Sequence, residues 1–368
     1  MASRDEESGA GVISPAPETV LARSLALDVL RIFAAAWVVT FHWSYLTTTL
    51  PGWLYDFMRA GYFGVDIFFM LSGAVIIHTA VGRTWSTFAQ SRFLRLFPVY
   101  VAATALVLVF RMLTDADYRP SPEQWVGLTG VQFWLNVDPI IGAAWTLRYE
   151  VGFYLLITVL IIASRNLVSE RTVRVGVYGF LVVWMLASAT QLSALQFITL
   201  DIYGPMFVFG VLLGISRDTT SLRRNAPAIF VAGALTFSSL LQRSGGNHWT
   251  EASRVALVFA IIIGVTAVIL WASLRPAKPV SVPWVHRWVA TVSLMTYPIY
   301  LLHNEFGFGL TGWIFGAGIP TVIAYVAGMV VVVLISFLSV RFFEPWARSG
   351  LRRLFGWGTG ARLTSERK

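Results

Sequence analysis

The chain has 368 residues, of which 56% are hydrophobic and only 13% are charged, and its mean hydropathy is +0.68. Soluble globular proteins carry about twice that charged fraction, so the composition excludes an ordinary soluble domain. Apolar runs of about twenty residues recur along the chain, and each is long enough to cross a hydrocarbon layer of about 30 Å. Because these runs are continuous rather than alternating, they exclude a β-barrel and predict an all-α, polytopic integral membrane protein.

The sequence contains no cysteine, which excludes disulfides, thiolate metal sites and a cysteine nucleophile. The formal net charge of +9 invites a nucleic-acid-binding interpretation. Most of the charged residues, however, lie between the apolar runs, where basic residues set the orientation of membrane helices. We therefore expect a lipid bilayer as a partner and no nucleic acid. The five histidines lack close metal-ligand spacing, so no metal site is expected.

Three parts of the chain are expected, in order. Residues 1–24 lack the basic start and apolar middle of a signal peptide and are expected to form a disordered cytoplasmic tail. A transmembrane domain is expected over 25–346, followed by a basic cytoplasmic tail over 347–368. The domain is predicted to contain about ten transmembrane helices, at residues 27–48, 61–80, 93–113, 141–163, 173–190, 196–215, 227–242, 254–273, 289–310 and 320–342.

The distribution of arginine predicts the orientation of these spans. With the N-terminus inside, the inner segments hold most of the basic residues of the chain. The outer segments then hold only Arg59, Arg111, Arg119, Arg243 and Arg254. Cytoplasmic segments of membrane proteins carry an excess of arginine and lysine. Both termini are therefore expected to be cytoplasmic.

The first span contains LDVLRIFAAAWVVTFH, from Leu27 to His42. Its Arg31 and His42 are eleven positions apart, which is within about 20° of three full helical turns, so they share one helix face and stand ~16 Å apart along the axis. Ionisable groups are costly inside a bilayer, so two of them on one face predict a functional site. Taken singly, Arg31 also fits a snorkelling interface anchor, and His42 also fits a hydrogen bond between helices.

The second span contains GYFGVDIFFMLSGAVI, and the third begins with SRFLRLFPVY. Asp66 is expected in the outer half of the bilayer, where a carboxylate needs a partner or a neutral form. Ser72 and Gly73 lie near the middle and also fit close helix packing. Arg92 and Arg95 are one turn apart at the inner surface. They fit either a positively charged flank of the helix or a clamp for phosphates that enter from the cytoplasm.

The fourth span starts with AAWTLRYEVGFYLL, and the ninth contains SLMTYPIYLLHNE. Glu150 is expected at a depth similar to that of His42, which predicts a histidine–carboxylate pair that orients the imidazole and stabilises its protonated form. His303 is the second histidine expected inside the membrane. Candidates by position alone for stabilising an oxyanion are Trp145, Arg148 and Tyr149.

In this order, the segments resemble the bacterial membrane acyltransferase-3 family of O-acyltransferases. The resemblance covers about residues 25–346 and is carried by LDVLRIFAAAWVVTFH, GYFGVDIFFMLSG, RFLRLFPVY, WTLRYEVGFYLL and SLMTYPIYLLH. A closing FFEPWAR, with Glu344 and Pro345, is similar to the end of the last helix in the family. The form WTLRYE looks closest to members that acetylate exopolysaccharides.

The resemblance implies an acyl-CoA donor on the cytoplasmic side, acetyl-CoA by default, and no tightly bound cofactor. It implies an acceptor hydroxyl on a saccharide or glycoconjugate at the outer face of the bacterial inner membrane. It also marks Arg31 and His42 as essential, and we add Glu150 to this catalytic group. The residues expected to bind substrate are Arg92, Arg95, Asp66, Ser72, Trp145, Arg148, Tyr149 and His303.

Other interpretations stay open at this point. His42 is either the general base on the acceptor hydroxyl or a nucleophile that forms a transient acyl-histidine. Ten helices with buried charges also suit a transporter or flippase of a glycolipid or small polar solute, although the two matching halves of many transporters are not evident. A non-catalytic scaffold or receptor gives no reason for so many ionisable residues inside the membrane.

Overall fold

The computed structural model describes residues 24–46, 51–130, 132, 137, 139–245, 250–275 and 283–357. The expected tail over 1–24 lies outside these ranges except for its last residue, and so does the end of the chain from residue 358. Over the described ranges the chain forms helices and no strand. This confirms the expected all-α, polytopic membrane fold.

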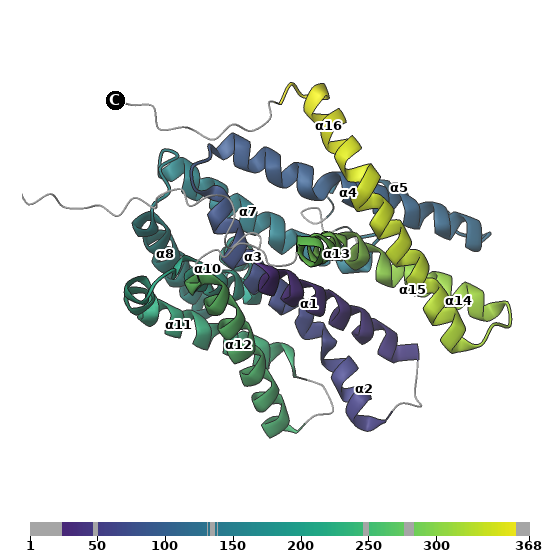
Figure 1. Ribbon diagram of the computed structural model, residues 1–368, viewed down its shortest axis with the longest axis horizontal. Coiled ribbons are helices and arrows are strands. Elements are labelled where there is room, and N and C mark those ends of the chain that lie inside the picture. The colour runs from purple at the N-terminus through teal and green to yellow at the C-terminus, as the bar shows by residue number, and fades with distance from the viewer. Residues whose placement is uncertain are drawn as a thin grey trace, which may run out of the picture.

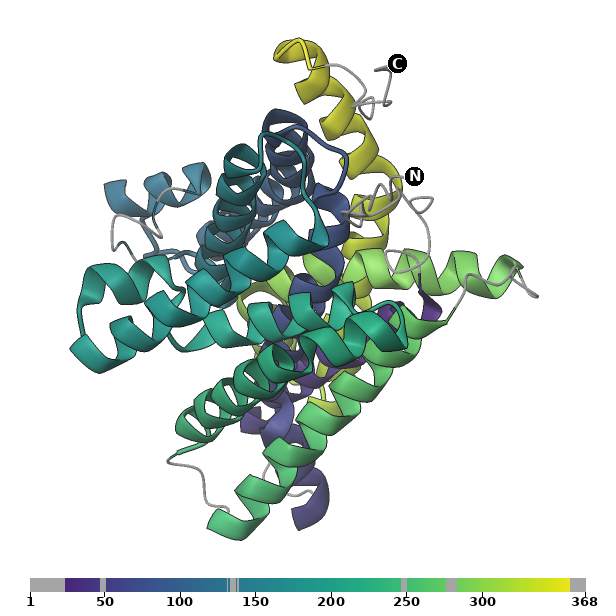
Figure 2. The ribbon, with the colours of Figure 1, turned by 90° about the vertical axis from the view of Figure 1, so that its left-hand side faces the viewer.

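Eight helical segments in the described ranges are long and apolar enough to cross a membrane. They contain α1 (Leu25–Trp43), α2 (Gly52–Arg59) with α3 (Gly64–Ala80), α4 (Trp85–Thr114), α7 (Trp145–Ala163), α8 (Glu170–Thr190), α11 (Thr219–Arg243), α12 (Glu251–Leu274), and α15 (Thr321–Leu338) with α16 (Glu344–Leu354). Figures 1 and 2 show the helices packed into one bundle, with the C-terminal helix α16 along one side of it, next to α4.

Two of the ten predicted spans differ from the expectation. The sixth, at 196–215, is divided between α9 (Ser193–Ile198) and α10 (Gly204–Ile215). Helix α10 has 12 residues, all of them buried, and at 1.5 Å per residue it is ~18 Å long, shorter than the hydrocarbon layer is thick. Its apolar sequence therefore reflects the protein interior and not contact with lipid. The ninth, at 289–310, is α13 (Pro283–Leu302) continued by the π-helical turn η6 (His303–Phe308) and α14 (Gly309–Gly316).

The C-terminal helix of the described ranges continues beyond the expected end of the transmembrane domain. Residues 347–354, expected in a basic tail, continue α16, which packs on α4. Arg348 forms an ion pair with Glu344 one turn earlier, and its Nε donates a hydrogen bond to the Leu94 carbonyl at 3.3 Å. Pro345 lies in the first turn of α16, where a missing backbone N–H is tolerated. These contacts hold the segment in a helix against the bundle.

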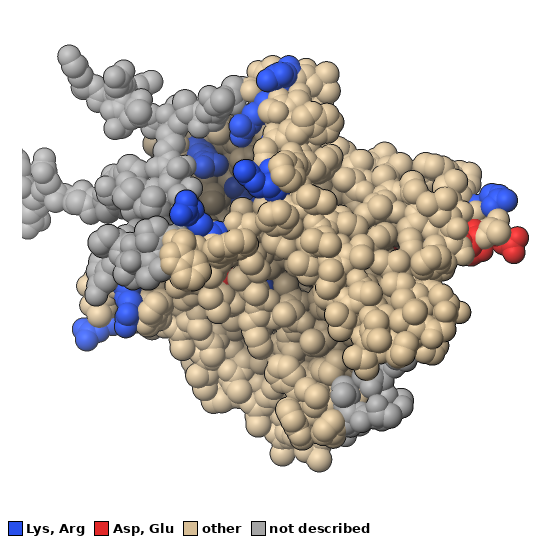
Figure 3. All heavy atoms as spheres, turned by 45° about the vertical axis from the view of Figure 1, so that its right-hand side comes forward, with Lys and Arg blue, Asp and Glu red and all other residues tan. Residues whose placement is uncertain are grey.

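The arginine distribution predicts that certain connections between helices are cytoplasmic, and these connections lie together at one end of the bundle. The backbone N–H of Trp85, after the α3–α4 connection, donates to Asn166 Oδ1 in the α7–α8 connection at 3.2 Å. His78 near the end of α3 bonds to the Gly214 carbonyl at 2.9 Å and to Arg217, which follows α10. In Figure 3 most of the arginine side chains drawn in blue lie toward one end of the face, on the left of the view, and a smaller group lies at the opposite end. This arrangement fits the predicted orientation.

Helices α3 and α10 are in very close contact in the centre of the bundle. A Cβ at Gly73 would lie 2.0 Å from the Phe207 carbonyl oxygen, and a Cβ at Gly210 would lie 1.9 Å from the Met70 carbonyl oxygen. Only glycine fits such a contact, and small residues are the usual means by which membrane helices approach closely. Of the two interpretations of this part of α3, helix packing therefore applies to Gly73.

Gly210→Ala is expected to destabilise the bundle by about 1–3 kcal/mol, because the added methyl group overlaps the Met70 carbonyl. The measurement is the unfolding temperature of the detergent-solubilised protein, followed by size-exclusion fluorescence after heating. Gly264→Ala in α12 is the matched control, since its Cβ would meet nothing within 4 Å, and it is expected to be neutral or slightly stabilising. Equal unfolding temperatures for the two variants would contradict the requirement for glycine at the contact between α3 and α10.

Candidate functional site

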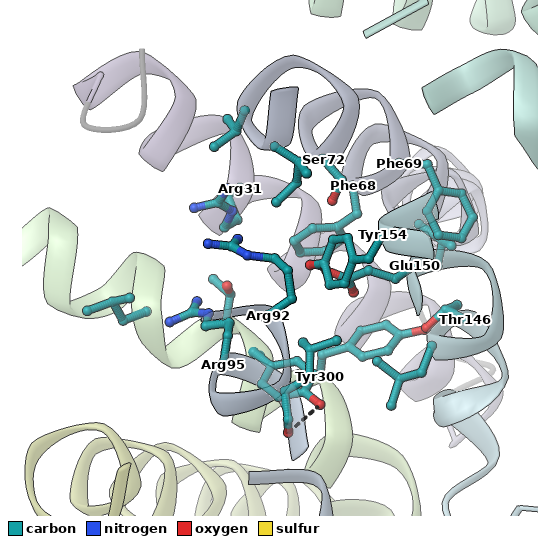
Figure 4. Close-up of a pocket in the computed structure, with 18 residues that line it drawn as sticks. Arg31, Phe68, Phe69, Ser72, Arg92, Arg95, Thr146, Glu150, Tyr154 and Tyr300 are labelled. Atoms are coloured by element: carbon teal, nitrogen blue, oxygen red, sulfur yellow. Dashed lines mark hydrogen bonds between the residues drawn. The ribbon is translucent and has the colours of Figure 1, made fainter. Parts of the chain in front are cut away.

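A cavity of about 290 Å³ opens between α1, α3, α4, α7 and α13. Figure 4 shows the side chains that line it. Aliphatic and phenyl side chains form part of the lining. Its polar lining consists of Arg31, Ser72, Arg92, Arg95, Thr146, Glu150, Tyr154, Thr296, Tyr297 and Tyr300. The fold thus brings together residues from all five of the stretches that carried the expected site.

The guanidinium groups of Arg31, Arg92 and Arg95 gather on one side of the cavity (Figure 4). Arg31 is held in place by α13: its Nη1 donates to Ser293 Oγ at 3.4 Å, and Ser293 in turn donates to Asp28 at 2.6 Å. Asp28 also lies 3.7 Å from the Arg31 guanidinium. Three cations therefore line one cavity, and Glu150 is the one carboxylate among its lining residues. Such a site favours an anion.

The structure does not form the predicted pair between Glu150 and His42. Glu150 accepts a hydrogen bond from Tyr154, one turn further along α7, and faces the arginine-lined cavity. His42 is not among the residues that line this cavity. Thr146, Glu150 and Tyr154 recur every four residues, so they lie on one face of α7, and that face looks toward the arginines of α4. The charge of those arginines gives the carboxylate a counter-ion there.

The His42 ring instead packs on a second histidine. Its centroid is 5.0 Å from that of His303, with 58° between the ring planes, and also 5.0 Å from that of Phe41. The carboxylate that acts electrostatically on His42 is Glu305. Glu305 forms an ion pair with Arg111 and accepts a hydrogen bond from the backbone N–H of Gly142 at 3.2 Å. Sequence reasoning missed Glu305, although it stands two residues after His303 in the same quoted stretch.

Tyr300 forms the contact between the arginine-lined cavity and the two histidines. It lines the cavity, and its ring centroid lies 5.7 Å from that of the fully buried His303. Its hydroxyl donates to the Ala143 carbonyl at 3.0 Å, which fixes the ring. His42 therefore adjoins the cavity through Tyr300 and His303. His42 does not line the cavity itself, so the cavity does not extend from the guanidinium groups to His42.

Asp66 was expected to need a partner inside the membrane, and the structure pairs it with Arg243. Its side chain is fully buried and forms an ion pair with Arg243, at the end of α11. The Arg243 guanidinium lies 4.9 Å from the ring centroid of Tyr203 and 5.8 Å from that of Tyr62. Neither member of the pair lines the cavity, although Ser72 of the same helix does. Nothing in the sequence indicated Arg243 as the partner, because 177 positions separate the two residues.

The three candidates that precede Glu150 face away from the cavity. Trp145 and Tyr149 pack on Tyr203, with ring centroids 5.4 Å and 4.4 Å from its ring. The Arg148 guanidinium lies 4.8 Å over the ring of Phe197. Successive residues of a helix point in different directions, so the face that carries Glu150 into the cavity turns these three toward α9 and η5 (Asp201–Tyr203).

Asp66→Asn is expected to lower the stability of the protein by about 3–5 kcal/mol, because it leaves the largely buried Arg243 without its counter-ion. Adding Arg243→Gln is expected to recover part of that loss. The measurement is the unfolding temperature in detergent for both variants. Arg224→Gln serves as the control, since Arg224 is 54% exposed and 3.9 Å from Glu170, and such a pair is worth about 1 kcal/mol or less. An Asp66→Asn protein as stable as this control would show that the pair does not support the fold.

Comparison with known proteins agrees with the resemblance seen in the sequence. The family model described as an acyltransferase domain matches residues 24–341, which is most of the chain. No curated protein and no solved structure matches the chain. The match includes the cavity, both histidines and the ion pairs of Asp66 and Glu305. The chain therefore belongs to the acyltransferase-3 family and is a multi-pass membrane acyltransferase.

Proposed function

We propose that this protein is an O-acyltransferase that moves an acyl group, acetyl by default, from acyl-CoA to a hydroxyl of a saccharide or glycoconjugate. The observation that carries the proposal is the group of three arginines in one cavity, which adjoins a histidine pair, in a chain of the acyltransferase-3 family. The bacterial inner membrane is the proposed location, with the donor on the cytoplasmic side and the acceptor on the outer side.

The donor phosphates are proposed to bind Arg92 and Arg95, with Arg31 deeper in the cavity. A guanidinium binds phosphate through two parallel hydrogen bonds, and Arg31 is already oriented by Asp28 and Ser293. Arg348 of α16, bonded to the Leu94 carbonyl, adds a further basic group beside Arg95. Once phosphate is bound, the pantetheine arm extends toward the outer half of the bundle. The spacing of ~16 Å between Arg31 and His42 along α1 is comparable to the reach of that arm.

In the proposed reaction, His42 takes the proton of the acceptor hydroxyl while the oxygen attacks the thioester carbonyl carbon. The tetrahedral intermediate then breaks its C–S bond, and the departing thiolate of CoA takes the proton back from the imidazolium. A positioned base of this kind contributes about 10²–10⁴-fold. Glu150, between the arginines and Tyr154, is proposed to balance the positive charge of the three arginines before the donor binds.

Two tests separate this function from the alternatives. A transporter or flippase does not consume thioester, so release of free CoA thiol by the purified protein with a glycan acceptor supports the enzyme. Incubation with labelled acetyl-CoA alone then separates the two mechanisms, because an acyl-histidine would leave label on the protein and a general base would not. The acceptor is identified by comparing the glycans of a deletion strain with those of the wild type, because the ester that this protein forms is then absent.

His42→Ala is expected to abolish acyl transfer, because the acceptor hydroxyl loses its base, while the protein still folds and inserts. The measurement is thiol release together with size-exclusion behaviour in detergent. His286→Ala, near the start of α13 and not part of the cavity lining, is the matched control and is expected to keep normal activity. Normal acyl transfer by His42→Ala would remove His42 from the mechanism.

Arg95→Ala is expected to raise KM for acetyl-CoA about 10–100-fold, because a hydrogen bond between charged groups contributes about 1.5–3 kcal/mol. With acetyl-pantetheine, which has no phosphate, wild type and variant should differ little. Arg119→Ala is the control: Arg119 bonds only to nearby backbone carbonyls in the α4–α5 connection. An equal rise in KM for both donors would show that Arg95 does not bind phosphate.

A further inference from the structure

The hydrogen bonding of His303 determines which of its ring nitrogens carries a hydrogen. Nδ1 lies 2.7 Å from the backbone carbonyl oxygen of Tyr300. A carbonyl oxygen only accepts hydrogen bonds, so Nδ1 must be the donor. The side chain is fully buried, and no carboxylate of the described residues pairs with it to support a cationic ring. A neutral ring with hydrogen on Nδ1 presents an unshared electron pair at Nε2.

That Nε2 atom has no hydrogen-bond partner among the described residues. A buried acceptor left unpaired costs about 1–3 kcal/mol, and such atoms are rare enough in folded proteins to require an explanation. The backbone around His303 is also unusual, because the π-helical turn η6 begins at this residue. Short π-helical segments occur frequently at functional sites.

The ring of His42 is in contact with His303 and can supply a hydrogen. The two ring centroids are 5.0 Å apart, and a neutral His42 carries one ring N–H. Tyr300 also touches His303, but its hydroxyl hydrogen is already donated to the Ala143 carbonyl. Reorienting the partly exposed His42 ring is enough to direct an N–H toward Nε2, because the contact between the rings is already made.

We propose that His303 is a positioning residue whose Nε2 accepts a hydrogen bond from a ring N–H of His42 during acyl transfer. This inference rests on the proposed function, since it assigns to His303 the orientation of the general base. When one ring nitrogen of His42 donates its hydrogen to His303, the other ring nitrogen carries a lone pair that is directed at the acceptor hydroxyl. The acceptor proton moves to that nitrogen and later to the CoA thiolate, and the hydrogen shared with His303 stays on His42.

Two substitutions of His303 separate this role from a structural one. His303→Asn keeps an amide N–H near the position of Nδ1, so it retains the bond to the Tyr300 carbonyl, but it has no acceptor at the position of Nε2. His303→Gln reaches the position of Nε2 with its carbonyl oxygen and so retains the acceptor. We expect His303→Asn to lower kcat about 10–100-fold, as is usual for the loss of an orienting partner, without changing KM for acetyl-CoA. His303→Gln is expected to recover most of kcat.

A purely structural His303 predicts the opposite result, since His303→Asn would then be as active as wild type. That outcome would overturn the proposal, and so would a folded His303→Gln protein no more active than His303→Asn.

The tautomer is tested without any variant by solid-state NMR of the protein in lipid, with ¹⁵N-labelled histidine and the His303 signal assigned through its contact with labelled Tyr300. The expected signal is a neutral ring protonated at Nδ1 and unprotonated at Nε2. A ring protonated at Nε2 would overturn the inference. If wild-type protein consumes no thioester, the proposed function is wrong, and this measurement still decides the tautomer of His303.

Discussion

The internal neutralisation of charge is the constraint on which the rest of this structure depends. Lipid supplies neither water nor counter-ions, so an ionisable side chain inside a helical bundle needs a partner from the protein. Among the ion pairs of the described residues, Asp28 with Arg31, Asp66 with Arg243, Arg111 with Glu305, and Glu344 with Arg348 meet this need, while Glu170 at the start of α8 pairs with Arg174 and Arg224. Two of the first four pairs join helices that are distant in sequence, so the same contacts that neutralise charge also define which helices are neighbours.

The arginine-lined cavity is the place where this neutralisation is incomplete. Three guanidinium groups face it, and its lining contains one carboxylate, Glu150. An excess of positive charge at a protected site is unfavourable unless an anion enters, and a phosphorylated donor is such an anion. The proposed function uses the cavity in this way, as the binding site of the donor phosphates. The two histidines adjoin the cavity through Tyr300, and under the proposed function the thioester end of the donor is directed to them.

Much of the site could be predicted because helical periodicity is a local property. Arg31 and His42 lie on one helix, α1, as their spacing required, and Arg92 and Arg95 both face the cavity. The pairing of Glu150 could not be predicted in this way. Its depth in the membrane was comparable to that of His42, but the rotation of α7 turned it to the arginines of α4 instead. Depth along a helix follows from the sequence, whereas rotation about the helix axis depends on packing against neighbours.

The sequence by itself determined that this protein is a helical membrane protein, where most of its spans begin and end, and which polar residues enter the membrane. Hydropathy, arginine distribution and the 3.6-residue period suffice for these points because each acts within one helix. Only the tertiary structure decided that Asp66 pairs with Arg243, that Glu305 is the carboxylate near His42, and that α10 is a short interior helix. These features depend on contacts between helices far apart in the chain, for which an apolar sequence carries no local signal.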